Sequence, residues 1–493
     1  MEAVAVFSDA DADALHVRRA DRAVRIGPTS PAESYLRVDA LIDAAKKTGC
    51  DALHPGYGFL SEQPGLARAC ARNDIVFVGP TPKTLEMLGD KLAARRLARD
   101  AGVPVVPGTL EPARTDAPSE LDAVVAAARR VGFPLLVKAT AGGGGRGMRE
   151  VARVEALPES LAAASREAEA AFGDGSVYLE RVLRPARHVE VQLLGDRERV
   201  VALGERDCSI QRRHQKLVEE APAPTLTRQQ RRALHRHAVA LGRAAGLQGA
   251  STAEFLVDAK GRAWFLEVNT RLQVEHGITE LVTGVDLVHE QLRIAADGLI
   301  SNAALDAAHH AADPRAHAIE VRITAEDPGD EFRARPGRLS RWVQPSGPGV
   351  RVDSGVEAGS SIPGAYDSLM AKLMTWAPDR PTAIARLRRA LDELEVAGVQ
   401  TDLPFLRFVA ADVDFAAARV DTGYVDRAWR PAPSRAEAEA TAASAAAMLA
   451  ALDPALASGR AAADGNGARR RHPASPDDPW LSEARGEAVD RWP

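Results

Sequence analysis

A glycine-rich run, Gly142–Gly147, lies between two patterns typical of β-strands, Leu135–Ala139 and Met148–Val154. The run fits G-x-G-x-x-G, but a dinucleotide-binding turn needs a helix after it, and a Walker loop needs Lys followed by Ser or Thr. Neither requirement is met, so the two commonest nucleotide folds are excluded at this position. The pattern instead predicts a hairpin loop whose N–H groups close over a polyphosphate while Lys138 meets an α- or β-phosphate. A flexible surface hairpin is the alternative.

Three oxygen-bearing side chains belong to a second predicted hairpin, formed by Thr252–Val257 and Ala263–Asn269. Residues two apart in a strand point to the same face, so Glu267 and Asn269 share a face that Glu254 can meet from the partner strand. Carboxylate and amide oxygens of this kind hold Mg²⁺ together with ATP phosphates. A solvent-facing strand with scattered charges is the alternative, but the apolar residues between them favour burial, and a buried unpaired carboxylate is costly.

Two charged segments complete the candidate chemistry. Arg206–Lys216 reads as a solvated basic loop, as a weak nucleic-acid patch without stacking aromatics, or as an anion pocket in which Lys216 supplies a point charge. In Thr270–His276, Arg271 and Glu275 are predicted to project from one face directly after the metal strand. A guanidinium suits an oxyanion and a carboxylate beside it could be a general base. An ion pair between the two is the alternative.

The N-terminal part alternates strand and helix patterns. Ala3–Phe7 and Ile75–Val78 are predicted strands, and Leu36–Thr48 and Lys83–Ala101 are predicted helices. This βαβ rhythm predicts a parallel, doubly wound domain within an α/β chain. The chain opens directly on a strand, with no βα unit before it.

Along the rest of the chain, the predicted mixture of helices and strands changes twice. Strands are predicted before residue 258 at Val177–Glu180, His188–Leu194 and Val200–Glu205, with helices at Leu157–Phe172 and Arg228–Ala245. From Ala316 to about Asp426 strands dominate apart from a helix at Thr382–Ala397, which suggests a separate α+β domain. The tail from Pro431 has the composition of a linker with one possible helix, Ala436–Leu452.

The composition limits the number of domains, the class of partner and the cellular compartment that we expect. The 493 residues correspond to about three domains. The formal net charge of -5 argues against a protein held by nucleic-acid phosphates. Three widely spaced cysteines indicate a reducing, cytoplasmic compartment. No signal peptide or membrane-spanning stretch is apparent. We therefore expect no nucleic-acid or membrane partner.

With these residues in hand, the chain resembles biotin carboxylase, the ATP-grasp component of biotin-dependent carboxylases, from about Ala3 to Ala428. The strings that carry the resemblance are His54–Glu62, Arg206–Pro224, Leu266–His276 and Gly364–Lys372. The resemblance implies a biotin carboxylase N-terminal domain over 1–88, an ATP-grasp domain over 89–312 with a lid over 140–205, a C-terminal α+β biotin carboxylase domain over 313–428, and a linker or tail over 429–493.

It also implies the site residues. The residues that would contact ATP are Lys91, Lys138, Gly144, Gly145, Glu180, Arg181, Val182, Leu183, His188, His214, Glu254 and Glu267. Those that would hold Mg²⁺ or Mn²⁺ are Glu254, Glu267 and Asn269. Bicarbonate would be bound by Lys216, Arg271 and the backbone of Val274. Arg322 would lie near biotin, and Glu275 looks like the base that deprotonates bicarbonate.

The implied reaction is ATP- and bicarbonate-dependent carboxylation of biotin through carboxyphosphate. It would be the first half-reaction of an acetyl- or propionyl-CoA type carboxylase of fatty acid metabolism. The implied partners are a biotin carboxyl carrier protein, further copies of the chain and a carboxyltransferase subunit. A catalytically silent or fragmentary ATP-binding assembly subunit is the alternative, and a carbamoyl phosphate synthetase half is a weaker one.

The chain departs from the family pattern in three places. The family usually opens with a further strand–glycine turn–helix unit, so the resemblance implies a truncated N-terminal domain. Gly277 stands where a proline usually follows the Glu-His pair, and Ala253 replaces a bulky aromatic next to Glu254. The Ala-Met-Lys-Met turn of the family's carrier module is absent. The nearest string, Met370–Met374, is predicted to be a core segment.

Overall fold

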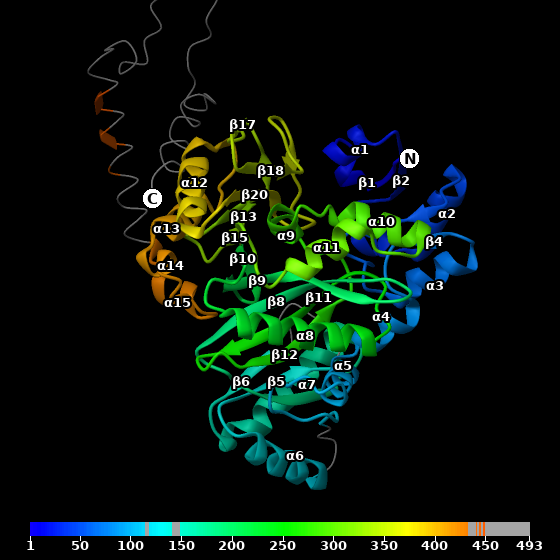
Figure 1. Cartoon of the computed structure of the whole chain (residues 1–493), viewed down its shortest axis with the longest axis vertical. Helices are drawn as coiled ribbons and strands as arrows, with labels where there is room; N and C mark the ends of the chain where they lie inside the picture. The colour runs from blue at the N-terminus through cyan, green and yellow to red at the C-terminus, as the bar shows by residue number, and fades with distance from the viewer. Residues whose placement is uncertain (114–117, 141–147, 432–439, 441–442, 445–446, 449–493) are drawn as a thin grey trace, which may run out of the picture.

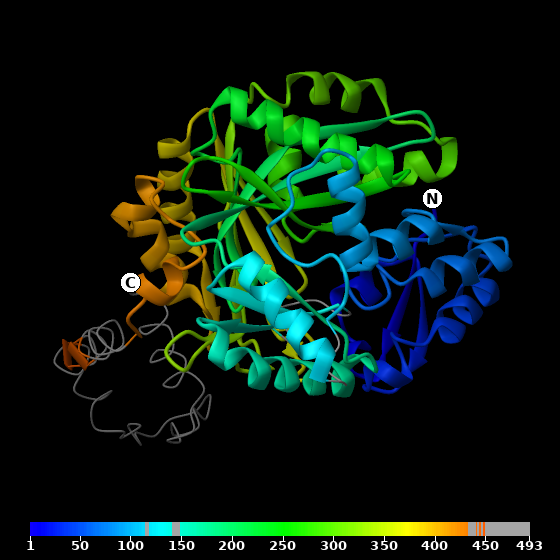
Figure 2. The ribbon, with the colours of Figure 1, turned by 90° about the horizontal axis from the view of Figure 1, so that it is seen from below.

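The computed structural model describes residues 1–113, 118–140, 148–431, 440, 443–444 and 447–448. A large antiparallel sheet lies at its centre, and three smaller bodies surround it (Figures 1 and 2). The N-terminal segment lies on one side of this sheet and the C-terminal helices on the other. The three-stranded sheet that carries α6 and α7 projects from the lower end in the view of Figure 1.

The N-terminal segment forms parallel strand pairs, as the sequence predicts. β1 (Val4–Ser8) pairs with β2 (Arg22–Gly27), and β3 (Ala52–Leu53) pairs with β4 (Val76–Phe77). Within the described residues the two pairs are separate sheets. The helices of this segment are α1 (Leu15–Arg19), α2 (Val38–Thr48) and α3 (Pro64–Arg72).

The prediction of a single helix over Lys83–Ala101 is wrong, because the helix is interrupted at Asp90. α4 (Pro82–Gly89) ends there and α5 (Lys91–Asp100) begins. Asp90 has an extended backbone, and its carboxylate accepts hydrogen bonds from the N–H groups of Leu92 and Ala93, each at 2.9 Å. An Asp side chain that satisfies the first free N–H groups starts a new helix even where the apolar pattern continues.

The predicted lid, residues 140–205, is divided between two sheets, because residues 186–205 belong to strands and a turn of the large sheet. The body that we call the lid below is a three-stranded antiparallel sheet in the order β6-β5-β7. β5 (Leu135–Ala139) pairs with β6 (Met148–Val151) and with β7 (Val177–Arg181), so the predicted first hairpin is confirmed. α6 (Pro118–Val131) and α7 (Leu157–Phe172) belong to this body. Its apolar core is separate from that of the large sheet. The glycine run lies outside the described residues.

The large sheet has eight strands in the order β12-β11-β8-β9-β10-β13-β20-β18. Their bounds are β8 (Ala186–Gly195), β9 (Val200–Arg212), β10 (Gln215–Ala221), β11 (Gly249–Asp258), β12 (Ala263–Asn269), β13 (His317–Thr324), β18 (Val350–Ser354) and β20 (Leu369–Ala377). The basic segment read as a loop is mostly strand, because β9 and β10 form a hairpin with Arg213 and His214 at its turn. β10 pairs with β13, so the sheet is continuous across the domain boundary that the sequence predicts at residue 313.

Helices cover the large sheet and close the C-terminal segment. They are α8 (Arg228–Ala244), α9 (His276–Thr283), α10 (Leu287–Asp297), α11 (Asn302–His310), α12 (Arg380–Glu393), α13 (Leu403–Ala411), α14 (Val413–Ala416) and α15 (Tyr424–Ala428). The predicted helix to Ala397 ends early, because Glu395–Ala397 forms strand β21, which pairs with β17 (Arg341–Val343). After β20 the segment is mainly helical, contrary to the prediction that strands dominate. None of the described helices is long and apolar enough to cross a membrane.

The break at Asp90 generates a stability prediction. Asp90→Ala should lower the free energy of unfolding by about 1 kcal/mol, because two N–H groups at the start of α5 lose their acceptor. Urea unfolding measures the change. Asp100→Ala at the other end of the same helix is the matched control, since Asp100 pairs with exposed Arg99 and should change stability by less than about 0.5 kcal/mol. Equal losses for the two variants would contradict the capping role.

Candidate active site

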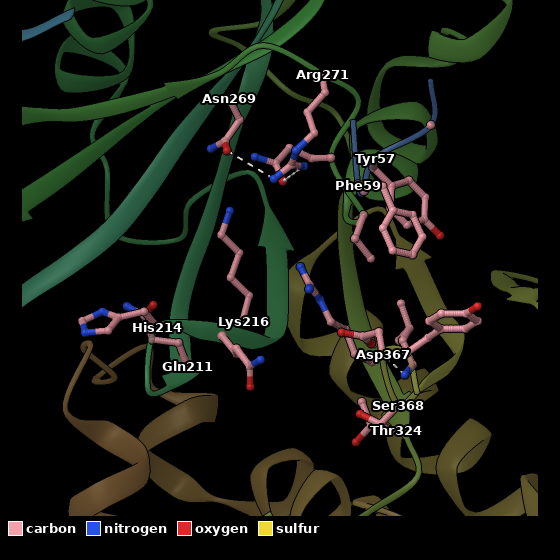
Figure 3. A pocket seen from close by; sticks show the side chains of 18 of the residues that line it. Tyr57, Phe59, Gln211, His214, Lys216, Asn269, Arg271, Thr324, Asp367 and Ser368 are labelled. Carbon is pink, nitrogen blue, oxygen red and sulfur yellow. Dashed lines mark hydrogen bonds between the residues drawn. The ribbon is translucent and has the colours of Figure 1, made fainter. Parts of the chain in front are cut away.

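A cleft of about 2110 Å³ joins all the bodies of the molecule. Its walls come from the N-terminal segment, the lid, the large sheet and the loop after β18. Figure 3 shows Lys216, Asn269 and Arg271 pointing into one part of it, with Tyr57 and Phe59 nearby. The site residues predicted from the sequence that lie in the described part of the chain line this cleft or lie directly beneath it.

The predicted metal-binding side chains are brought together. Glu254 on β11 lies directly opposite Glu267 on β12, and Asn269 is two residues further along. Asn269 Nδ2 donates to Glu254 Oε1 at 2.7 Å. Burial and the neighbouring Glu254 carboxylate raise the pKa of Glu267, because a negative charge nearby disfavours a second one. This donor set of two carboxylates and an amide oxygen fits Mg²⁺ or Mn²⁺.

Lys216 on β10 lies among three buried carboxylates. Its Nζ is 3.0 Å from Glu254 Oε1 and 2.6 Å from Glu275 Oε1, and it also contacts Glu190 Oε2. Burial opposes the charged form, but the three carboxylates, Glu190 foremost, hold the pKa of Lys216 well above its usual value. Lys216 therefore stays protonated and provides the positive charge that an anion in the cleft would meet.

Arg271 and Glu275 do not share a strand face, contrary to the sequence prediction. β12 ends at Asn269, and the chain turns through residues 270–275 into α9. Arg271 lies against Glu62, with Nε 3.2 Å from Oε2. Glu275 instead contacts Lys216 and Arg322, whose Nη2 is 2.9 Å from Oε2. The alternative of an Arg271–Glu275 ion pair is thus also wrong, because each residue has other charged partners.

The electrostatics of Glu275 follow from those partners. Its side chain is fully buried. Burial opposes ionisation, but Lys216 first and Arg322 second hold the pKa of this carboxyl well below its usual value. Glu275 is therefore ionised at neutral pH. Next to it, Lys372 Nζ donates to the carbonyl of Val274 at 2.8 Å and fixes the turn from the C-terminal side.

The predicted nucleotide-binding residues in the described part of the chain line the same cleft, next to the lid and the candidate metal site. Lys138 Nζ is 3.0 Å from Glu180 Oε1, and the other carboxylate oxygen of Glu180, Oε2, lies 2.6 Å from Nη1 of buried Arg95. Burial and then the charge of Lys138 lower the pKa values of Lys91 and His214. His188 Nε2 lies 2.9 Å from Glu254 Oε2. Arg181, Val182 and Leu183 follow Glu180 along the same wall, whereas Gly144 and Gly145 lie outside the described residues.

Sequence reasoning missed several residues that support the site. Arg206 is fully buried and donates to Glu190 at 2.6 Å and to Gln192 at 2.8 Å. The alternation of His188, Glu190 and Gln192 with apolar residues in β8 was a signal for a polar row on one face. No comparable signal marked Lys372, whose partner lies 98 positions away in the chain.

One departure from the family pattern has a physical explanation. A Cβ atom at Gly277 would lie 2.4 Å from Met374 Sδ on β20, which is too close for any side chain at position 277 without movement of Met374. The glycine is therefore matched to the methionine. Ala253 is completely buried in the core beneath β11, together with Phe255 and Phe265.

This fold and this site define an ATP-grasp ligase. Three family models cover the chain in sequence: "Biotin carboxylase, N-terminal domain" over residues 1–85, "Carbamoyl-phosphate synthase L chain, ATP binding domain" over 90–302, and "Biotin carboxylase C-terminal domain" over 320–427. The chain belongs to the biotin carboxylase family.

Relatives and solved structures agree with this assignment. Biotin carboxylase of Nostoc sp. is 46% identical, over 86% of this chain and 92% of that protein. The biotin-dependent acyl-coenzyme A carboxylase alpha3 subunit of Mycobacterium leprae is 46% identical, over 87% of this chain and 71% of its own length. The Campylobacter jejuni biotin carboxylase-beta-gamma-ATP complex has a TM-score of 0.82 at 41% identity, covering 86% of this chain and 93% of that one.

The charge cluster generates a pH-dependent prediction. Lys216→Met should lower the free energy of unfolding by about 3–5 kcal/mol near neutral pH, because three buried carboxylates lose their common cation. Without Lys216 their folded-state pKa values rise above the unfolded ones, so the deficit should grow as pH rises and shrink towards acid.

Urea unfolding of Lys216→Met across the pH range measures this effect. Lys216→Arg keeps a charge at the position, and Lys260→Met removes a lysine from an exposed turn, so both serve as controls. A deficit that is the same at all pH values would contradict the electrostatic explanation.

Proposed function

We propose that this chain carboxylates biotin on a separate carrier protein, using ATP and bicarbonate. The observation that carries the proposal is the position of Glu275. This buried, ionised carboxylate lies between Lys216 and Arg322, beside the two carboxylates of the β11–β12 hairpin. A base, an anion-binding cation and a candidate metal site within one cleft are what activation of bicarbonate for attack on a phosphate requires.

Lys138, Lys91 and His214 would bind the ATP phosphates, and Glu180–Leu183 would hold the adenosine end of the nucleotide. Glu254, Glu267 and Asn269 would hold Mg²⁺ or Mn²⁺, which supplies charge neutralisation at the transferring phosphoryl group. His214 has a lowered pKa, so it would meet the nucleotide as a neutral imidazole.

Lys216, Arg271 and the backbone of Val274 would hold bicarbonate, and Glu275 would accept its proton. As Lys216 turns from Glu275 to the incoming anion, the carboxyl loses its main stabilising cation and becomes a stronger base. The deprotonated oxygen attacks the γ-phosphorus, and ADP leaves with the bridging oxygen. Carboxyphosphate then breaks its C–O bond to give CO₂ and phosphate.

Phosphate would take the proton of the biotin ureido nitrogen, and that nitrogen attacks CO₂ while Arg322 stabilises the enolate oxygen. Arg322 is well placed for this role, since 17% of its side chain remains exposed to the cleft. Charge stabilisation by a preoriented guanidinium is effective in such a partly buried site.

We propose an acyl-CoA, of the acetyl- or propionyl-CoA type, as the final carboxyl acceptor. The M. leprae relative, an acyl-coenzyme A carboxylase subunit at 46% identity, supports this choice, and the pyruvate carboxylase relative from Methanothermobacter thermautotrophicus, at 43% identity, indicates pyruvate as the competing acceptor. Adding the cognate carrier and carboxyltransferase, and comparing acetyl-CoA with pyruvate as acceptors, tests it. Preferential carboxylation of pyruvate would overturn it.

Glu275→Gln and Arg271→Ala should each leave ATP binding intact and lower kcat for biotin carboxylation by about three orders of magnitude, with little change in the KM for ATP. The reason is that both groups act on bicarbonate and neither is placed at the nucleotide end of the cleft. Bicarbonate-dependent ATP hydrolysis with free biotin is the measurement, and it also separates an active enzyme from a silent assembly subunit.

Arg262→Ala is the matched control for Arg271→Ala, because Arg262 is exposed in the β11–β12 turn and pairs locally with Asp258. Near-normal kcat in Glu275→Gln would rule out the assigned base. No response of wild-type ATP hydrolysis to bicarbonate would rule out the proposed function.

The carrier should be a different polypeptide or a segment outside this chain. Lys372, in the string closest to a biotinylation turn, is on β20, which lies between β13 and β18, and is 5% exposed, so the predicted core position is confirmed. The 493-residue chain, co-expressed with a biotin protein ligase, should give no signal on a streptavidin blot. A co-expressed carrier module is the positive control, and a biotin signal on this chain would contradict the prediction.

A further inference from the structure

Two acidic side chains beneath the cleft have no part in the mechanism described above. Glu219 on β10 and Glu320 on β13 are directly opposite each other in antiparallel strands, and both are fully buried. Cross-strand neighbours have Cβ atoms about 5 Å apart, so like charges there repel strongly in a dry interior. One oxygen of Glu219 and both oxygens of Glu320 have no hydrogen-bond partner among the described residues.

The one clear hydrogen bond of this pair, within the described part of the chain, is made to Arg322. Arg322 is two residues after Glu320 on β13 and so lies on the same face. Its Nε donates to Glu219 Oε1 at 2.7 Å, while its Nη2 donates to Glu275 Oε2 at 2.9 Å. Glu219 therefore holds the inner edge of the guanidinium and Glu275 one outer nitrogen, with Nη1 not engaged in either bond.

We propose that Glu219 is a positioning residue, which orients Arg322 tightly at the wall of the cleft while it is ionised and holds it more loosely when it takes up a proton, with Glu320 opposite it remaining protonated. The proposal rests on the proposed function, because Arg322 acts there on biotin. A charge-assisted hydrogen bond to Nε is about twice as strong as a neutral one, so ionisation of Glu219 tightens the orientation of Arg322.

The surrounding charges support this division of roles. Burial, opposed chiefly by Arg322, raises the pKa of Glu219 to about 7. Burial, opposed by Lys372, holds the pKa of Glu320 well above its usual value. The titratable and charged groups that act on the pair come from β9, β10, β13, β20 and the turn before α9, and they are Cys208, Lys216, Arg322, Lys372 and Glu275. Glu275 itself stays ionised far below neutral pH, so it does not titrate in the same range.

These roles determine the direction in which kcat/KM should change with pH. The ionised form of Glu219 holds Arg322, so kcat/KM for free biotin should rise as pH increases from about 6 to about 8, through the pKa of about 7. In Glu219→Gln the amide oxygen can still accept from Nε but cannot ionise. The ratio of this variant to wild type should therefore fall as pH rises, to about one-tenth at pH 8. The ratio cancels the pH dependence of bicarbonate and ATP.

Glu320→Gln is the matched control, because it replaces a neutral carboxyl with a neutral amide in the same buried pair. Its ratio to wild type should be flat with pH. Glu219→Asp retains an ionisable group and should keep the rise. A flat ratio for Glu219→Gln, or a falling ratio for Glu320→Gln, would overturn the proposal.

A second readout does not depend on turnover. In infrared difference spectra, the buried carboxylic acid that titrates near pH 7 should vanish in Glu219→Gln and persist in Glu320→Gln. The opposite assignment would overturn the proposal even if an enzyme variant were unstable in the assay. If wild type shows this carboxyl but no bicarbonate-dependent ATP hydrolysis, the proposed function fails, whereas an active wild type without it refutes this inference alone.

Discussion

The ammonium group of Lys216 is the charge around which the site is assembled. Three carboxylates from different parts of the chain, on β8, on β11 and in the turn before α9, meet it in an interior where none of them could remain ionised alone. Arg206 lies beneath and compensates Glu190 from the other side. A buried network of this kind contributes less to stability than apolar packing would. Under the proposed function, this network prepares the residues that would bind and deprotonate bicarbonate.

The two ends of the cleft are supported in different ways. The candidate metal ligands are held by neighbouring strands of the large sheet, whose register fixes their separations, and the proposed base Glu275 lies in the turn before α9. Lys138 and Glu180 instead belong to the lid, a small sheet with its own apolar core. Separate cores allow one body to move relative to another without disturbing either interior. Under the proposed function, bicarbonate would meet residues of the large sheet, whereas the nucleotide would also meet residues of the lid.

Sequence patterns predicted what depends on local alternation. The hairpins β5–β6 and β11–β12 and the helix α7 follow directly from the periodicity of apolar residues and from turn residues. β10 was not predicted from the sequence, because this strand is rich in charged residues. Their buried partners lie on strands that are distant in the sequence. Residues 270–275 were predicted as a strand because their polar side chains alternate with other residues. The same alternation occurs in this turn, where successive side chains contact different neighbours. Burial of charge depends on partners remote in sequence, which a single sequence does not specify.

The ladder between β10 and β13 has a consequence for how such chains can be recombined. Glu219 and Arg322 meet only because β10 and β13, which lie on opposite sides of the predicted domain boundary at residue 313, are hydrogen-bonded to each other. The C-terminal segment is consequently no interchangeable module. A chimaera joined at that point must reproduce the strand register residue for residue, since a slip of one position would turn the guanidinium to the opposite face of the sheet. Exchange between related enzymes is therefore expected to preserve the register between β10 and β13.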